Sequence, residues 1–116
     1  MANNIAFTPM GKTYKLNAAT TIQQVTLYSD SPSNQYMIVN HENANTGLPV
    51  YVRITTSATA NVGLPTNASP NYAVIVPQDT RMVVSGPQVT NTAPVYVTFV
   101  SESGTPEAYI VPGEGL

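Results

Sequence analysis

The 116-residue chain contains no cysteine and no tryptophan, and only 9% of its residues are charged. Without cysteine it can form no disulfide, no thiolate zinc site and no cysteine nucleophile. A typical soluble domain has about 25% charged residues, whereas here serine, threonine and asparagine together supply 34 residues. We therefore expect one domain with a mostly neutral polar surface, large enough to bury about two-thirds of the surface of its unfolded chain.

Positive charge is scarce and dispersed. The four basic residues, Lys12, Lys15, Arg53 and Arg81, are scattered along a chain with a formal net charge of −2. Nucleic-acid binding depends on clustered Lys and Arg that neutralise phosphates. We therefore expect no nucleic-acid partner.

Long apolar runs are also missing. No stretch approaches the 18 apolar residues of a membrane span, and the sequence MANNIAFTPMGKTYK lacks the regions of a secretory signal. We expect no membrane partner and a protein made in a cytosol, yet the composition is typical of extracellular adhesins and shells. A virion component reconciles both, because it is assembled in the host cytoplasm without a signal and then released in a particle. Removal of a signal would also reconcile them, but Met1 argues against it.

The residues that are abundant favour β-structure. Valine, isoleucine and threonine supply 35 residues, and ten prolines and seven glycines interrupt the chain. Short alternating segments between turns predict an all-β, antiparallel sandwich or jelly roll in one domain, with almost no helix. Residues 1–20 are predicted to form an N-terminal arm and the first strands, and residues 21–116 the sandwich. The predicted strands are Ile5–Thr8, Thr13–Asn17, Val25–Tyr28, Gln35–Asn40, Leu48–Thr55, Tyr72–Val76, Thr80–Ser85, Pro94–Ser101 and Ala108–Val111.

Two of these strands share the tetrapeptide Pro-Val-Tyr-Val, at Pro49–Val52 and Pro94–Val97. In each, alternation turns the valines toward a core and the tyrosine outward. We expect them to occupy equivalent places on opposing sheets. Residues 17–24 are interpreted as strand or loop, and residues 57–71 as the longest loop, the one expected to project or move.

No pattern of an enzyme is present. His41 has no second histidine at ligand spacing, the six carboxylates are isolated in sequence, and the serines and glycines match no nucleophile or phosphate-loop motif. We therefore predict no catalytic residue, no metal and no cofactor. The glycosylation sequon at Asn67 is interpreted as an ordinary polar loop.

A candidate protein interface comes from exposed aromatic residues. Tyr51 and Tyr96 are predicted on the strand faces opposite the valines, and Arg53 shares the face of Tyr51. Ordinary cross-strand pairing of the tyrosines is an equal alternative. In the N-terminal arm, the apolar residues Ile5, Phe7 and Met10 predict docking on a neighbouring molecule, with packing on the protein's own sheet edge as the alternative.

From about Thr21 to Gly115, the chain resembles the capsid decoration, or cement, proteins of tailed bacteriophages. The segments that carry the resemblance are Gln35–Asn40 (QYMIVN), Pro49–Ile54 (PVYVRI), Val74–Pro77 (VIVP), Arg81–Val84 (RMVV) and Ala108–Gly115 (AYIVPGEG). The first 20 residues and residues 57–71 do not match. The resemblance implies a jelly-roll-like sandwich that binds the outside of an icosahedral head and bridges subunits of the major capsid protein.

Under this hypothesis the chain is a non-enzymatic virion protein, located on the capsid surface and in the host cytoplasm during assembly, and it forms a dimer or trimer on the shell. A phage neck or tail component is one alternative. A carbohydrate-binding β-sandwich module that uses exposed tyrosines is another, and an enzyme is a distant third.

Overall fold

The computed structural model describes residues 7–41, 48–59 and 61–115. Nine strands and no helix are present in this part of the chain. The strands are β1 (Thr8–Pro9), β2 (Tyr14–Asn17), β3 (Gln23–Leu27), β4 (Ser33–Asn40), β5 (Val50–Thr55), β6 (Val74–Val76), β7 (Thr80–Val89), β8 (Val95–Val100) and β9 (Glu107–Glu114). The predicted all-β fold is confirmed.

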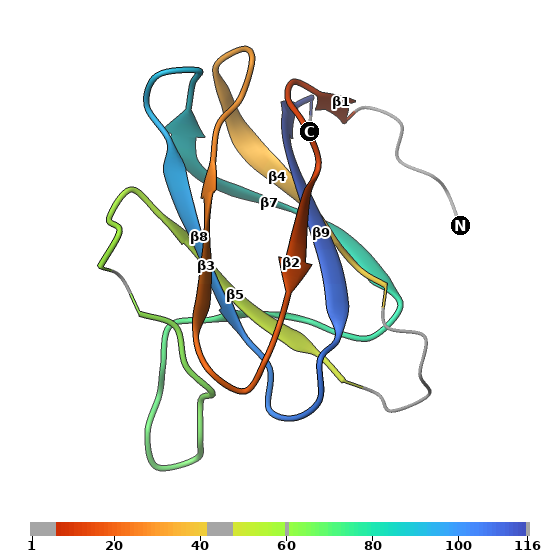
Figure 1. Cartoon of the computed structure of the whole chain (residues 1–116), viewed down its shortest axis with the longest axis vertical. Helices are drawn as coiled ribbons and strands as arrows, with labels where there is room; N and C mark the ends of the chain where they lie inside the picture. The colour runs from red at the N-terminus through yellow and green to blue at the C-terminus, as the bar shows by residue number, and fades with distance from the viewer. Residues whose placement is uncertain (1–6, 42–47, 60, 116) are drawn as a thin grey trace.

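The strands form two antiparallel sheets that pack face to face (Figure 1). Sheet A has the order β2-β9-β4-β7, with β1 following β2 along the same edge of β9, and sheet B has the order β3-β8-β5-β6. Pairing is nested, because β2 pairs with β9, β3 with β8, β4 with β7, and β5 with β6. Apart from the two-residue strand β1, the two sheets contain eight antiparallel strands. This double-sheet arrangement is a jelly roll.

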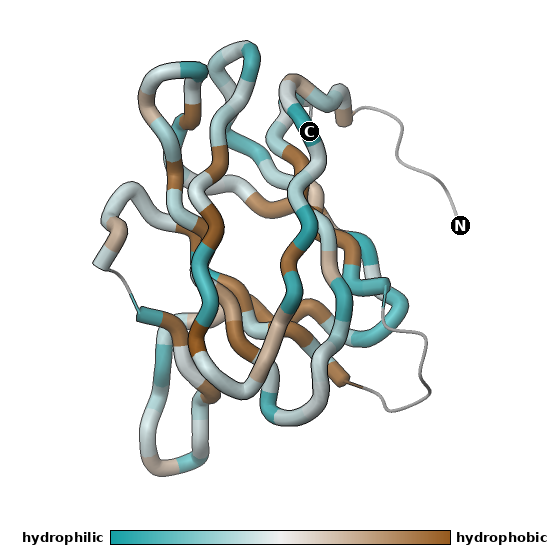
Figure 2. Tube along the Cα trace, viewed as in Figure 1, coloured by the Kyte–Doolittle hydropathy of each residue, from teal (hydrophilic) through white to brown (hydrophobic). Residues whose placement is uncertain are grey.

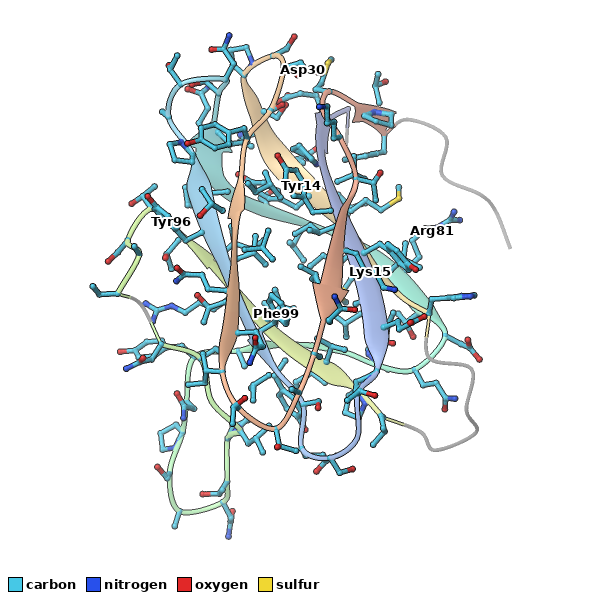
Figure 3. The ribbon with its side chains drawn as sticks, in the orientation of Figure 1. Tyr14, Lys15, Asp30, Arg81, Tyr96 and Phe99 are labelled. Carbon is cyan, nitrogen blue, oxygen red and sulfur yellow. The ribbon has the colours of Figure 1, made fainter. Side chains whose placement is uncertain are left out.

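The core lies between the sheets, where the alternating residues of β5 and β8 meet those of sheet A. Val50, Val52, Val95 and Val97 are buried, as the alternation predicts. Figure 2 shows the hydrophobic residues mainly along the strands, where they alternate with hydrophilic ones on β2 and β3. In Figure 3, Phe99 points into the space between the sheets, whereas Tyr96 of the same strand points away from it.

The prediction that the two Pro-Val-Tyr-Val strands lie on opposing sheets is wrong. Strands β5 and β8 are antiparallel neighbours at the centre of sheet B, with Val52 opposite Phe99 and Ile54 opposite Val97. Both strands turn their valines toward the core because neighbouring strands of one sheet share the same inward face. A common alternation therefore says which face is buried but not which sheet a strand belongs to.

Some predicted boundaries also differ. Strand β7 continues to Val89, beyond the predicted end at Ser85, and a register shift against β4 accommodates Pro87. Residues 18–22 form a loop between β2 and β3. Of the first predicted strand, Phe7 precedes β1 and Thr8 begins it, whereas Ile5 lies outside the described residues.

Two buried side chains, Tyr36 and Asn40, form hydrogen bonds within the sandwich. The hydroxyl of Tyr36, on β4, donates a hydrogen bond to the Pro87 carbonyl at the irregular part of β7. The Asn40 side-chain amide donates to the carbonyl oxygens of Leu48 and Val76, both at 3.0 Å. Since Asn40 belongs to sheet A and Val76 to sheet B, this amide links the two sheets.

We predict that Tyr36→Phe lowers the free energy of unfolding by about 1–2 kcal/mol, because the partly buried Pro87 carbonyl loses its donor. Urea denaturation measures the change. Tyr28→Phe is the matched control, because Tyr28 is 43% exposed and its hydroxyl can be hydrated in both the folded and the unfolded state. Equal stability of the two variants would contradict the role assigned to the Tyr36 hydroxyl.

Stability should also fall at alkaline pH. Burial raises the pKa of Tyr36 from 10.0 to about 12. The folded state therefore holds this proton more tightly than the unfolded state, and the resulting stability is complete below pH 10 and lost as the pH rises to 12. The free energy of unfolding should drop by about 1.4 kcal/mol per pH unit in this window from Tyr36 alone. Tyr36→Phe should show a shallower decline in pH-dependent urea denaturation, and parallel curves for the two proteins would refute the assignment.

Candidate protein-binding site

Phe7 and Met10, two of the three N-terminal residues predicted to dock on a neighbour, lie against the protein's own sheet edge. Phe7 is buried, and a Cβ built on Gly113 would collide with its ring. The Met10 backbone N–H donates to the Pro112 carbonyl at 2.9 Å, while its carbonyl accepts from Asp30 N–H at 2.9 Å. These contacts are the ones that the alternative interpretation expects, and docking on a neighbouring molecule stays a prediction. Ile5 lies outside the described residues.

The outer face of sheet B, the side turned away from sheet A, carries Tyr51, Arg53 and Tyr96 as predicted. All three are half-buried. Burial raises the pKa of Tyr51, and the negative charge of Glu102 raises it further. Tyr96 lies opposite Thr26 on one side and Thr55 on the other, which fits the cross-strand alternative.

The long loop between β5 and β6 folds back over part of this face. Gln24, Thr98 and Arg53 form one cross-strand row on β3, β8 and β5. The Gln24 side-chain amide donates to the Ala58 carbonyl at 3.0 Å, and Arg53 Nη1 donates to the Asn61 carbonyl at 2.8 Å. Gln24 and Arg53, the two outer residues of this row, therefore both bind the backbone of the loop.

The covered residues are correspondingly buried. Thr98, which the alternation places outward, is only 1% exposed, and Val62 of the loop is 2% exposed. Val62 is therefore packed on the protein, although residues 56–59 and Asn61 of the same loop are exposed. The sequence could not show this, because a single valine among polar residues gives no periodic signal.

The second part of the loop does project, as a finger of residues 64–72 that are all exposed (Figure 1). Its tip is closed by two backbone hydrogen bonds, Thr66 N–H to the Ser69 carbonyl at 2.9 Å and Ser69 N–H to the Thr66 carbonyl at 3.2 Å. The Thr66 hydroxyl oxygen also accepts from Ser69 N–H at 3.0 Å. Asn67 lies at this tip, and Tyr72, which is 67% exposed, lies at the base.

An apolar cavity opens at the sandwich edge above this base. Its volume is about 250 Å³, and its lining comes from four strands, β4, β5, β6 and β7, and from Tyr72 and Ala73, which precede β6. Ile38 of β4 and Val52 of β5 are core residues that also line the cavity, so the core is reached directly from the edge. The other principal lining residues are Arg53, Ile54, Tyr72, Ala73, Val74 and Val84.

The cavity exists because sheet B is incomplete at its edge. Strand β6 pairs with β5 only at Val50–Val52, although β5 continues to Thr55. No described strand pairs with Arg53–Thr55 on the β6 side, where the chain has already turned into the finger. The side of Arg53–Thr55 that faces away from β8 therefore has no described strand partner, although the Tyr72 ring lies close to Arg53 there, and this side is called the open strand position below.

Arg53 and Tyr72 form the rim of the cavity. The Arg53 guanidinium carbon lies 4.3 Å from the centroid of the Tyr72 ring, a cation–π contact. Within the described ranges the single ion pair is Lys15 with Glu107, at 3.2 Å, so the Arg53 charge faces no carboxylate there. The rim thus combines an exposed aromatic ring with an uncompensated positive charge.

Beside the cavity, Val74 and Ile75 of β6 are 41% and 45% exposed. The alternation predicts a strand here, but it could not identify an edge position, which depends on the pairing of the whole chain. Arg53 is thus the predicted interface residue that belongs to the cavity, whereas Tyr51 and Tyr96 do not line it. Tyr72 and Val74 were not singled out by the sequence.

The side chains that could bind a metal are dispersed among residues 7–41, 48–59 and 61–115. These ranges contain no group of three or more His, Asp or Glu side chains that could hold a metal. His41 is exposed and borders a shallow depression with Asp79 and Arg81. In the same ranges, no helix is long and apolar enough to cross a membrane.

No protein-family model, curated protein sequence or solved structure matches the chain.

We predict that Val62→Ala lowers the free energy of unfolding by about 1–3 kcal/mol, because two buried methyl groups are lost from the contact between loop and sheet. Leu64→Ala, two residues further along the same loop, removes an exposed side chain and should cost less than about 0.5 kcal/mol. Urea denaturation of both variants makes the measurement. An unchanged stability in Val62→Ala would mean that the loop does not pack on sheet B.

Proposed function

We propose that this chain is a non-enzymatic virion protein that binds the outside of an icosahedral phage head and bridges subunits of the major capsid protein. The observation that supports this proposal best is the apolar cavity beside an open strand position, on a jelly roll with a charge-poor surface. Jelly rolls occur in viral capsid proteins and in lectins, so the fold alone does not decide the function.

The surface around the cavity suits association with another protein. No residue from Ile54 to Gln78 is charged. Placing residues 54–78 against a partner buries no charge from this stretch, so Arg53 at the cavity rim is the charge that a partner has to satisfy, because burial of an unpaired charge makes an interface costly. The exposed ring of Tyr72 and the side chains of Val74 and Ile75 supply the apolar and aromatic contacts that are enriched at the centres of interfaces.

Stabilisation of a shell then follows from mass action. A protein that binds only the assembled seam between subunits adds its binding free energy to the assembled state. A contribution of about 5 kcal/mol per copy corresponds to a Kd of only about 0.2 mM. Many copies on one shell therefore provide a large barrier to rupture without any single tight contact.

Particles that lack this protein should assemble normally but rupture at a lower temperature than complete particles, because each seam loses a bridging contact. The measurement is release of the genome during a temperature ramp, with purified protein added back to the depleted particles as the control. Add-back should restore the original rupture temperature.

Quantification of copies per particle separates the alternatives. Saturation of the shell surface supports decoration. A few copies per particle, or a failure to assemble shells, would refute it and favour a neck, tail or scaffolding component, and absence from particles together with binding to a glycan array would favour a carbohydrate-binding module.

A further inference from the structure

The open strand position on β5 is complementary to an extended polypeptide. Arg53, Ile54 and Thr55 pair with β8 on one side, whereas β6 has already ended on the other. An edge of this kind presents unpaired backbone groups on alternate residues, to which an incoming strand can hydrogen-bond. Here the open edge is three residues long, so the backbone pairing it offers is short.

The cavity lies next to this edge and has room for one side chain. Its volume of about 250 Å³ lies below the range of about 300–1,000 Å³ typical of small-molecule sites. Its lining is mainly aliphatic, from Ile38, Val52, Ile54 and Val84. An edge that offers backbone pairing and a pocket that takes an alternate side chain are the two parts of recognition by strand addition.

The residues of β5 set the pattern of the incoming strand. Residues that lie opposite one another in a sheet share a face, and successive residues point to opposite faces. Ile54 packs against the core, so the residue opposite it would point into the cavity. The residue opposite Arg53, its immediate neighbour in the partner, would point to the outer face beside the guanidinium.

The positive charge of Arg53 indicates the type of the partner residue that lies opposite it. Arg53 donates one hydrogen bond to Asn61 and contacts the Tyr72 ring, and it forms no ion pair with any described carboxylate. A carboxylate on the neighbouring strand would supply that partner, and cross-strand pairs of opposite charge are favourable. A second positive charge at the same place would be repelled.

We propose that a short extended segment of the shell protein adds to sheet B beside Arg53–Thr55, with an aliphatic or aromatic side chain in the cavity and an Asp or Glu immediately next to it paired with Arg53. This inference names the contact used in the proposed function and rests on that function for the identity of the partner. The chemistry of the segment follows from β5 and the cavity alone.

The first experiment uses isolated protein and synthetic peptides, and so does not depend on the shell. The probe is a capped Thr-Thr-Leu-Asp-Thr-Thr hexapeptide, titrated into isotope-labelled protein while backbone amide NMR shifts are recorded. Saturable shifts at Arg53–Thr55 and Ala73–Val74 are expected. Peptides with Asp replaced by Lys, with Leu replaced by Ala, or with Leu and Asp separated by one Thr should bind at least about tenfold more weakly.

Two substitutions in the protein block the cavity. Ala73→Phe places a ring at its wall, and Val74→Trp does so at a position that is 41% exposed, where folding tolerates a larger side chain. Ile75→Trp is the matched control, because Ile75 is next to Val74, is similarly exposed and does not line the cavity. Both blocking variants should lose peptide binding, and the control should retain it within about twofold.

A charge reversal tests the acidic neighbour. Arg53→Glu should abolish the preference for the Asp peptide and favour the Lys peptide instead, while Arg81→Glu, which reverses an exposed arginine on β7 outside the cavity, should leave the preference unchanged. Equal binding of all peptides, or shifts confined to another surface, would overturn the proposal.

The same variants are then added to shells depleted of this protein. If the wild-type protein and the Ile75→Trp control bind shells while Ala73→Phe and Val74→Trp do not, the cavity is the shell contact. If all four proteins bind equally, the inference fails and the decoration function stands. If wild-type protein does not bind shells at all, the proposed function fails, whatever the peptides show.

Discussion

The nested antiparallel pairing of the two halves of the chain determines where every other feature lies. Strand β2 needs β9, β3 needs β8 and β4 needs β7, so most of the sheet contacts join residues far apart in sequence. Such pairing requires the entropy of long loops to be lost before the strand contacts stabilise the fold, and folds of this kind form slowly. The innermost pair, β5 with β6, closes this nested arrangement with the shortest strand of the eight-stranded roll.

The cavity is a consequence of that short closing strand. Three residues of β6 cannot cover six residues of β5, so the core remains accessible beside Ile54. The end of β6 is nevertheless fixed, because Asn40 on sheet A donates to the Val76 carbonyl on sheet B. A buried, satisfied amide of this kind favours one arrangement of the sheets over others. This link lies at the Val76 end of β6, whereas the open strand position lies beyond its Val74 end.

How much of this follows from the sequence depends on whether the cause is local. The inward valines of β5 and β8 are predictable because alternation is a property of each strand by itself. Burial of Thr98 is not, because a loop 37 to 40 residues earlier in the chain covers it through Gln24 and Arg53. The same limit applies to Val74, whose exposure depends on its edge position. Phe7 was predicted to be an apolar residue needing a partner surface, and only the tertiary structure shows that Gly113 provides it.

The scarcity of charge gives the cavity its selectivity. On a surface rich in Lys and Glu, one more arginine would be screened by neighbours and would distinguish partners poorly. Arg53 instead borders a stretch of 25 residues, Ile54 to Gln78, without any charge. Its guanidinium is held by the Asn61 carbonyl and placed over the Tyr72 ring. A charge fixed in this way discriminates between acidic and basic neighbours, while the adjacent apolar cavity supplies affinity that salt does not screen. The Arg53 guanidinium thus provides the selectivity of this edge, and the aliphatic side chains that line the cavity provide its affinity.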